Sequence, residues 1–226
     1  MQSCFVKCIM STIIHSNADI LNMETRYRAA FINTLSGFKS ANLIATIDEQ
    51  GQTNCAVFNS VVHIGAHPPL LGFICRPDSV DRHTLENILQ TSYYTINHVN
   101  KSIYQQAHKT SARYDKETSE FEAVGLTEQW IEDFSAPFVK QSRIQLGMEL
   151  REHHILTINN TELIIGEIVY INVKDDVVNE DGYVAIEHAN SLAISSLDTY
   201  HETALLSHLS YAKPDQAVKE ITLRKK

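Results

Sequence analysis

The sequence predicts a mainly β fold, an antiparallel β-barrel with helical decorations, within 226 residues. Apolar, strand-length runs recur along the chain, and several are joined by short polar turns rather than by the long crossovers that parallel strands need. Two of these turns, Glu49-Gln50-Gly51-Gln52 and Asn159-Asn160-Thr161, carry the glycine and asparagine residues that tight turns favour. A chain of this length can bury a substantial core.

The elements follow from local patterns. A capping serine and apolar positions at helical spacing predict one helix over residues 16–38. The later strands and helices are predicted from runs of apolar and β-branched residues and from their boundaries. Strands are expected over residues 41–48, 55–64, 70–75, 93–99, 142–156 and 163–173, helices over about 81–90 and 101–109, and an optional terminal strand over 218–223. Residues 110–137 are polar and irregular, with Phe121, Leu126 and Trp130 expected as apolar anchors.

Composition excludes several classes of function. The formal net charge of −8 disfavours a nucleic-acid partner, because phosphate contacts need a concentrated basic surface. No stretch approaches the roughly 18 apolar residues of a membrane span, so no membrane is expected. Cys4, Cys8, Cys55 and Cys75 do not form a secreted disulfide framework at this length, and residues 1–14 lack the features of a signal peptide. We therefore expect a cytoplasmic protein.

Motifs for metal or covalent catalysis are weak. His63 and His67 are four residues apart, but a double proline follows them and makes a helix unfavourable there. His153 and His154 would point to opposite faces of a strand. The chain has neither a GxSxG nucleophile elbow nor a GxGxxG dinucleotide loop. We expect no metal site and assign no catalytic side chain.

Residues 54–87 have the order of elements that a phosphorylated, flat cofactor needs. Arg82 and Thr84 stand at the start of a predicted helix, where cations, hydroxyls and free backbone N–H groups favour a phosphate. Thr46, Asn59 and Ser60 offer short hydrogen-bonding groups for a ribityl chain, and Val61 and Val62 offer apolar walls for a ring. From residue types alone, the plainer interpretation is favoured, in which Arg82 and Thr84 simply begin a surface helix.

A resemblance to a known family changes that balance. The segments that carry it are KSANLIATIDEQGQTNCAVFNSVV, HPPLLGF, RHTLENI, EFEAVGLT and IIGEIVYINV, with the asparagine of YYTINHV at Asn97. In this order they resemble the flavin reductase-like family, whose FMN-binding split barrel dimerises around two flavins. The similarity covers roughly residues 38–200. It implies three parts: an N-terminal extension and helix (1–37), the flavin reductase-like split-barrel domain (38–200) and a C-terminal extension (201–226).

The resemblance implies that Thr46, Asn59, Ser60, Arg82 and Thr84 contact FMN. Ser40, Asn42 and Val61 are further members of the implied cofactor-binding set. The chain departs from the family pattern at His83, which replaces an acidic residue, and at Arg82, which replaces a lysine but keeps its charge. SLAISSLDTYH also lacks the arginine that many relatives carry near this position, so the resemblance does not assign which residues line the substrate side of the flavin.

The expected function is that of an FMN-binding oxidoreductase. In the first hypothesis, NADH or NADPH donates a hydride to flavin N5, and free flavin or a protein partner accepts the electrons. The expected assembly is a homodimer with the flavin at the interface. In the alternative, the protein is an FMN-binding electron carrier, similar to a flavoredoxin, that a protein partner reduces. An oxygen-using flavin oxidase and a split barrel without a working cofactor pocket also stay open.

Overall fold

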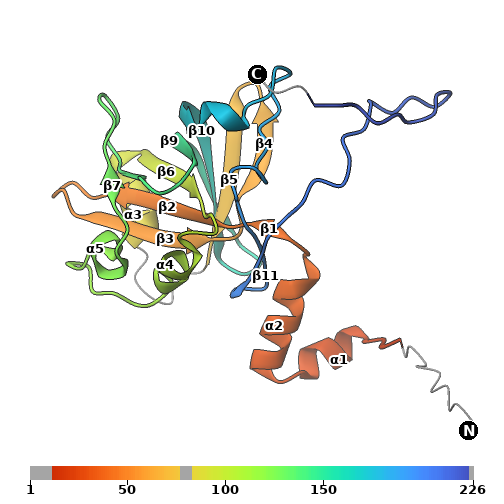
Figure 1. Ribbon diagram of the computed structural model, residues 1–226. Coiled ribbons are helices and arrows are strands. Elements are labelled where there is room, and N and C mark those ends of the chain that lie inside the picture. The colour runs from red at the N-terminus through yellow and green to blue at the C-terminus, as the bar shows by residue number, and fades with distance from the viewer. Residues whose placement is uncertain (1–11, 77–82, 224–226) are drawn as a thin grey trace, which may run out of the picture.

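A computed structural model describes residues 12–76 and 83–223 and confirms a mainly β, antiparallel architecture (Figure 1). The N-terminal half contains α1 (Asn17–Asn22), α2 (Thr25–Leu35), β1 (Lys39–Ser40), β2 (Asn42–Ile47), β3 (Thr53–Phe58), β4 (Val62–Ala66), β5 (Pro69–Cys75), α3 (His83–Thr91), β6 (Tyr93–His98) and α4 (Tyr104–Lys109). The remainder contains α5 (Glu120–Val124), β7 (Glu128–Gln129), β8 (Phe138–Val139), β9 (Ile144–Leu156), β10 (Thr161–Val173), the 3₁₀ turn Asp175–Val177, β11 (Ala193–Ser195) and β12 (Thr199–His201).

A seven-stranded sheet forms the body of the molecule, with strand order β3-β2-β6-β9-β10-β5-β4. Each neighbouring pair is antiparallel, and β9 and β10 form the long hairpin that the sequence predicts. A three-stranded sheet, β1-β11-β12, and the short pair β7-β8 complete the β structure of the described residues.

Several expectations differ from the structure. The optional terminal strand over 218–223 is reduced to an isolated bridge between Leu209 and Glu220. Residues 16–38 form two helices, because the Glu24 carboxylate caps a new helix by accepting a hydrogen bond from the Tyr27 N–H at 2.8 Å. Residues 55–64 form parts of two strands, which separate at Asn59. Trp130 is 49% exposed, since its indole N–H finds a partner at the surface in the Glu128 carboxylate, whereas Phe121 and Leu126 are buried as expected.

The sheet curls so that its two outermost strands approach each other at one end. β3 and β4 are the outermost strands in the sheet order, yet only residues 59–61 join them. Consecutive Cα atoms are about 3.8 Å apart, so Phe58 and Val62 lie within about 15 Å of each other. Figure 1 shows β2 and β3 running across one part of the molecule and β4 and β5 standing upright beside them. We call the junction between these two edges, spanned by residues 59–61, the seam.

Side-chain alternation along β2 assigns its two faces to different cores. Leu43 and Ala45 join a cluster that α4 and α5 cover, which also holds Ile103, Ala107 and Phe121. Ile44 points to the other face, where it packs in a cluster with Phe73, Tyr94 and Met148. Helix α3 closes this second cluster with Leu85 and Ile88. The period of two therefore places Asn42 and Thr46 on the same face as Ile44, beside α3.

Within residues 12–76 and 83–223, no helix is long and apolar enough to cross a membrane.

Candidate functional site

The seam segment is held in place by its own polar side chains. The Asn59 amide donates to the carbonyl oxygen of Ser196 at 2.7 Å, which ties the seam to the turn between β11 and β12. The Ser60 hydroxyl donates to the Ile74 carbonyl and accepts from the Ile74 N–H, both at 3.1 Å. This exchange continues the β4-β5 ladder by one step beyond the pair Val62 and Gly72. The segment therefore has a fixed course between the two edges.

Asn42 and Ser40 lie at the same end of the β2-β3 ladder as the seam. Asn42 pairs with Phe58, the residue immediately before Asn59. Its amide nitrogen donates to the Ser40 hydroxyl at 2.8 Å, and the residue is 1% exposed. The Asn42 Oδ1 atom is buried and has no hydrogen-bond partner among the described residues. A buried acceptor without a partner costs free energy, so this oxygen suits a donor from a ligand.

Thr46 and Thr84 meet at the opposite end of the same strands. Thr46 pairs with Asn54 across β2 and β3. The Asn54 amide donates to the Thr84 hydroxyl at 2.8 Å, and the Asn87 amide donates to the Thr46 hydroxyl at 3.0 Å. All four side chains are buried. These two crossing hydrogen bonds fix the first turns of α3 against the sheet.

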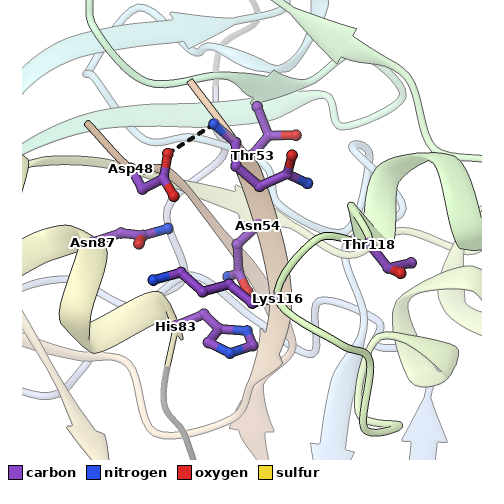
Figure 2. A pocket seen from close by; sticks show the side chains of 8 residues that line it. Asp48, Thr53, Asn54, His83, Asn87, Lys116 and Thr118 are labelled. Carbon is purple, nitrogen blue, oxygen red and sulfur yellow. Dashed lines mark hydrogen bonds between the residues drawn. The ribbon is translucent and has the colours of Figure 1, made fainter. Parts of the chain in front are cut away.

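A small pocket opens beside the N-terminus of α3 (Figure 2). Its lining is almost entirely polar: Asp48, Gln52, Thr53, Asn54, His83, Asn87, Lys116 and Thr118. Figure 2 shows the Lys116 side chain reaching from its loop across the pocket toward α3, and its ammonium lies 4.0 Å from the Glu86 carboxylate. The Asp48 carboxylate is turned back onto its own turn, where it accepts from the N–H groups of Gln50 and Gln52. The helix N-terminus and the Lys116 cation favour an anion here.

The expected site residues thus divide into two groups. Ser40, Asn42, Asn59, Ser60 and Val61 lie at the seam end, with Val61 packed against the core cluster around Phe73. Thr46 and Thr84 lie at the helix end. Four strand positions separate Asn42 from Thr46, which is about 13 Å at the usual rise per residue. Arg82 lies outside the described residues.

Sequence reasoning missed four residues that the structure adds to these two ends: Asn54, Asn87, Lys116 and Ser196. Asn87 stands inside RHTLENI, so that motif held a signal for it. Lys116 lies 29 residues along the chain from Asn87, which lines the same pocket, and Ser196 lies 137 residues from its partner Asn59. No local pattern marks such residues, because their positions depend on how the barrel closes.

The histidines have other partners. His153 contacts the Glu162 carboxylate, and His154 contacts that of Glu152. In the two described ranges, no group of three or more His, Cys, Asp or Glu side chains is arranged to hold a metal ion. Cys4 and Cys8, weak candidates from the sequence, lie outside those ranges.

Comparisons with known proteins agree with this geometry. A family model for the flavin reductase like domain matches residues 35–193. A crystal structure from Shewanella frigidimarina, described as a candidate flavin reductase with a split barrel domain, is 55% identical. It covers 89% of this chain and 100% of its own, with a TM-score of 0.86.

Two more distant structures share the fold. Flavoredoxin of Desulfovibrio vulgaris is 19% identical, covering 80% of this chain and 93% of its own with a TM-score of 0.66. An FMN-binding protein from Thermus thermophilus is 16% identical, covering 74% of this chain and 87% of its own with a TM-score of 0.61. The family match spans most of the barrel, including both ends of the candidate site. The chain therefore belongs to the flavin reductase-like family.

Proposed function

We propose that this protein binds FMN non-covalently between the seam and helix α3 and acts as an NAD(P)H-dependent flavin oxidoreductase. The observation that carries the proposal is the division of the polar residues into two ends of one pair of strands. One end offers hydroxyl and amide groups beside an apolar core. The other offers a helix N-terminus and a cation. FMN has the matching halves, a polar-edged ring with a ribityl chain and a phosphate.

At the helix end, this chain's residues would hold the phosphate. The hydrogen bonds from Asn54 to Thr84 and from Asn87 to Thr46 orient the first turns of α3 before any ligand arrives. A preoriented helix N-terminus loses little entropy when it accepts an anion. Lys116 adds a positive charge from the facing loop. Arg82, outside the described residues, is the cation that the sequence assigns to the same group.

At the seam end, amides and hydroxyls would hold the ribityl chain and the ring edge. Asn59 and Ser60 are already fixed by Ser196 and Ile74, so this surface is rigid. The unpaired Oδ1 of Asn42 is an acceptor suited to a ligand hydroxyl or N–H donor. Val61, the last residue of the seam segment, would contribute apolar surface for a flat ring.

Bound FMN would supply the redox chemistry, accepting a hydride at N5 from NADH or NADPH and passing the electrons to free flavin or a protein partner. The protein's own part is to bind, to orient and to exclude water. Neither end of the site requires a side-chain acid or base for this task, and we assign none.

The alternative function is that of an FMN-binding electron carrier reduced by a protein partner. The fold shared with flavoredoxin is the observation that favours it. The two functions differ in one step, whether nicotinamide reduces the bound flavin.

A spectrum separates them. The purified protein is reconstituted with FMN, freed of excess cofactor and titrated anaerobically with NADH or NADPH. The reductase is supported if the flavin absorbance band bleaches with one equivalent of either nucleotide. A yellow protein that neither nucleotide bleaches points to the carrier. A protein that takes up no FMN rejects both.

The phosphate end has its own test in Lys116, whose half-exposed side chain lies 4.0 Å from the Glu86 carboxylate in a surface ion pair. Lys116→Ala should weaken FMN binding about fivefold, equivalent to about 1 kcal/mol for an exposed charge. Riboflavin, which lacks the phosphate, should bind the variant and the parent equally. Lys109→Ala, at the exposed end of α4, is the matched control for loss of a surface charge. Equal loss for FMN and riboflavin would place the phosphate elsewhere.

The assembly that goes with this function is a homodimer with flavin at the subunit interface. The family resemblance supports it. Light scattering of the FMN-loaded protein tests it, since a monomer that keeps its flavin would contradict a shared site.

A further inference from the structure

Two terminal segments stand outside the packed body of the molecule. None of residues 12–40 is buried, and none of residues 202–223 is buried. In Figure 1 both segments project beyond the outline of the barrel on the same side, the C-terminal one as a long extended excursion. We call residues 202–223 the arm.

The arm carries a series of exposed apolar side chains. Leu206 is 99% exposed and Tyr211 is 90% exposed. Four more, each about half-exposed, accompany them: Leu205, Leu209, Val218 and Ile221. Single exposed apolar residues are common on protein surfaces. Six within one short segment that has no core of its own indicate a surface that another chain covers.

The arm's internal bonds do not explain its shape. It folds back on itself through two backbone hydrogen bonds of 2.8 Å, from Ser210 to Lys219 and from Ile221 to His208. Isolated two-stranded hairpins are marginally stable in water. The contacts with its own body are few: a ring contact between Tyr183 and His208 at 5.6 Å, and an ion pair between Lys101 and Glu202 where the arm begins.

The N-terminal helices α1 and α2 also expose apolar side chains and bury none. Ser16 caps α1 with a complete capping box, so the helix is formed by local bonds. Leu21 and Leu35 remain exposed, and α2 buries no residue. Because α2 runs directly into β1, and β1 pairs with β11 two residues before the seam partner Ser196, both projecting segments leave the body close to the candidate site.

We propose that the arm packs against a second copy of this chain and clasps the dimer. This inference rests on the dimer proposed above and assigns its contact. In a two-fold dimer each copy gives one arm and receives one, so both arms are covered at once. The arm is about 20 residues long, which is about the size of one side of a standard interface.

The charge of the C-terminal end favours a second copy as the occupant. The arm itself holds two Lys against three Asp and Glu, and the three residues that follow it are all basic, so residues 202–226 together hold five Lys and Arg against three Asp and Glu in a chain whose net charge is −8. The C-terminal end, taken with these last three residues, is therefore the basic part of an acidic protein and is attracted to the acidic body of another copy. Edge strand β4, with Val62 and Ile64 exposed, offers apolar surface on the body for the arm's leucines.

Sedimentation equilibrium over a dilution series tests the proposal with four proteins. These are the full chain, a chain ending at His201, the double variant Leu206→Glu with Tyr211→Glu, and the control Leu89→Glu. Leu89 is a half-exposed leucine on α3, which lies away from the arm in Figure 1. The full chain and the control should be dimers. The shortened chain and the double variant should dissociate at concentrations at least tenfold higher or be monomeric.

Any other outcome contradicts either the role of the arm or the dimer itself. A shortened chain that dimerises as tightly as the parent rejects the arm and leaves the dimer. A monomeric full chain rejects the clasp and the dimer together. FMN binding measured on the same samples is separate, because a monomer that binds FMN leaves the cofactor assignment standing. Thermal unfolding of the double variant shows whether its fold is intact, and no buried side chain is changed in it.

Discussion

The Tyr94 side chain, from strand β6, reaches across the intervening strand β9, and its hydroxyl packs against Gly166 of β10. A Cβ atom added to Gly166 would overlap the Tyr94 hydroxyl oxygen and come within 3.1 Å of the Glu149 carbonyl oxygen. Tyr94 is fully buried, and its hydroxyl has no hydrogen-bond partner among the described residues. The glycine is thus required by the tyrosine ring in the core.

Gly166→Ala should destabilise the protein by about 1–3 kcal/mol, because the added methyl group forces the tyrosine or the strands to move. Urea unfolding measures the loss. Adding Tyr94→Phe to that variant should recover part of it, since the overlapping oxygen is gone. Gly65→Ala in β4 is the control, because its new Cβ would meet only Pro68 at an ordinary 3.4 Å. Equal losses for Gly65→Ala and Gly166→Ala would contradict the steric explanation.

His98 should make stability depend on pH below neutrality. Burial lowers the pKa of His98 to about 4, from 6.5 in the unfolded chain. Between these two pKa values the unfolded state is protonated at His98 and the folded state is not. Stability therefore falls as pH drops from about 6.5 to about 4, by at most about 3 kcal/mol. The measurement is urea unfolding over that range. His98→Gln, which can keep the bond to the Ser191 hydroxyl, should flatten the profile, and an unchanged slope would assign the effect to another group.

Glu120 should make stability depend on pH with the opposite sign to His98. Burial raises the pKa of this carboxyl, while the hydrogen bond from the Cys55 N–H, at 2.9 Å, acts against the rise. The folded state holds the Glu120 proton more tightly than the unfolded state does. The stability that this proton gives the folded state is therefore present below the usual carboxyl pKa and is lost as pH rises through the raised pKa. Glu120→Gln should remove this loss and keep an acceptor for Cys55.

Glu120→Ala separates charge from hydrogen bonding. It leaves the Cys55 N–H buried without a partner, so it should destabilise by about 1–3 kcal/mol at every pH. Thermal unfolding of both variants, compared with the parent, measures the difference. If the alanine and glutamine variants are equally stable, the bond to Cys55 contributes nothing.

Asn59→Ala should weaken the binding of both FMN and riboflavin about fivefold, the value of one neutral hydrogen bond. The reason is that the proposed site assigns Asn59 to the ring and ribityl end, where its amide also donates to the Ser196 carbonyl oxygen at 2.7 Å. Fluorescence titration measures both ligands. Asn159→Ala, in the turn between β9 and β10, is the control. A loss confined to FMN would move Asn59 to the phosphate end.

Local patterns predicted most of the strands because alternation and turn residues are encoded within a few positions. The β9-β10 hairpin appears where Asn159-Asn160-Thr161 predicts its turn. The break between β3 and β4 was missed because the apolar residues continue on both sides of Asn59. β3 ends at Phe58 because this residue pairs with Asn42, the first residue of β2, so its partner strand offers nothing to pair with beyond this point.

The candidate site likewise has residues that local motifs mark and residues that only the folded barrel brings together. Family motifs marked Thr46, Asn59, Ser60 and Thr84, and the structure brings Thr46 and Thr84 into one network and Asn59 and Ser60 into another. Their roles toward a flavin stay predictions. Asn54 and Lys116 could not be found in advance, because each joins the site only when α3 and a distant loop fold over β2 and β3.

The course of the sheet also bears on where strands from other molecules could add to this protein. An open sheet ends in rows of unpaired N–H and C=O groups that can template the addition of a strand from another molecule. Here residues 59–61 bring the ends of β3 and β4 toward each other at the seam. The Ser60 hydroxyl there bonds to the N–H and carbonyl groups of Ile74. Beyond this junction, β3 and β4 have no sheet neighbour on their outer sides in the part of the chain that the structure describes, so these two strands are the places where a strand from another molecule could add.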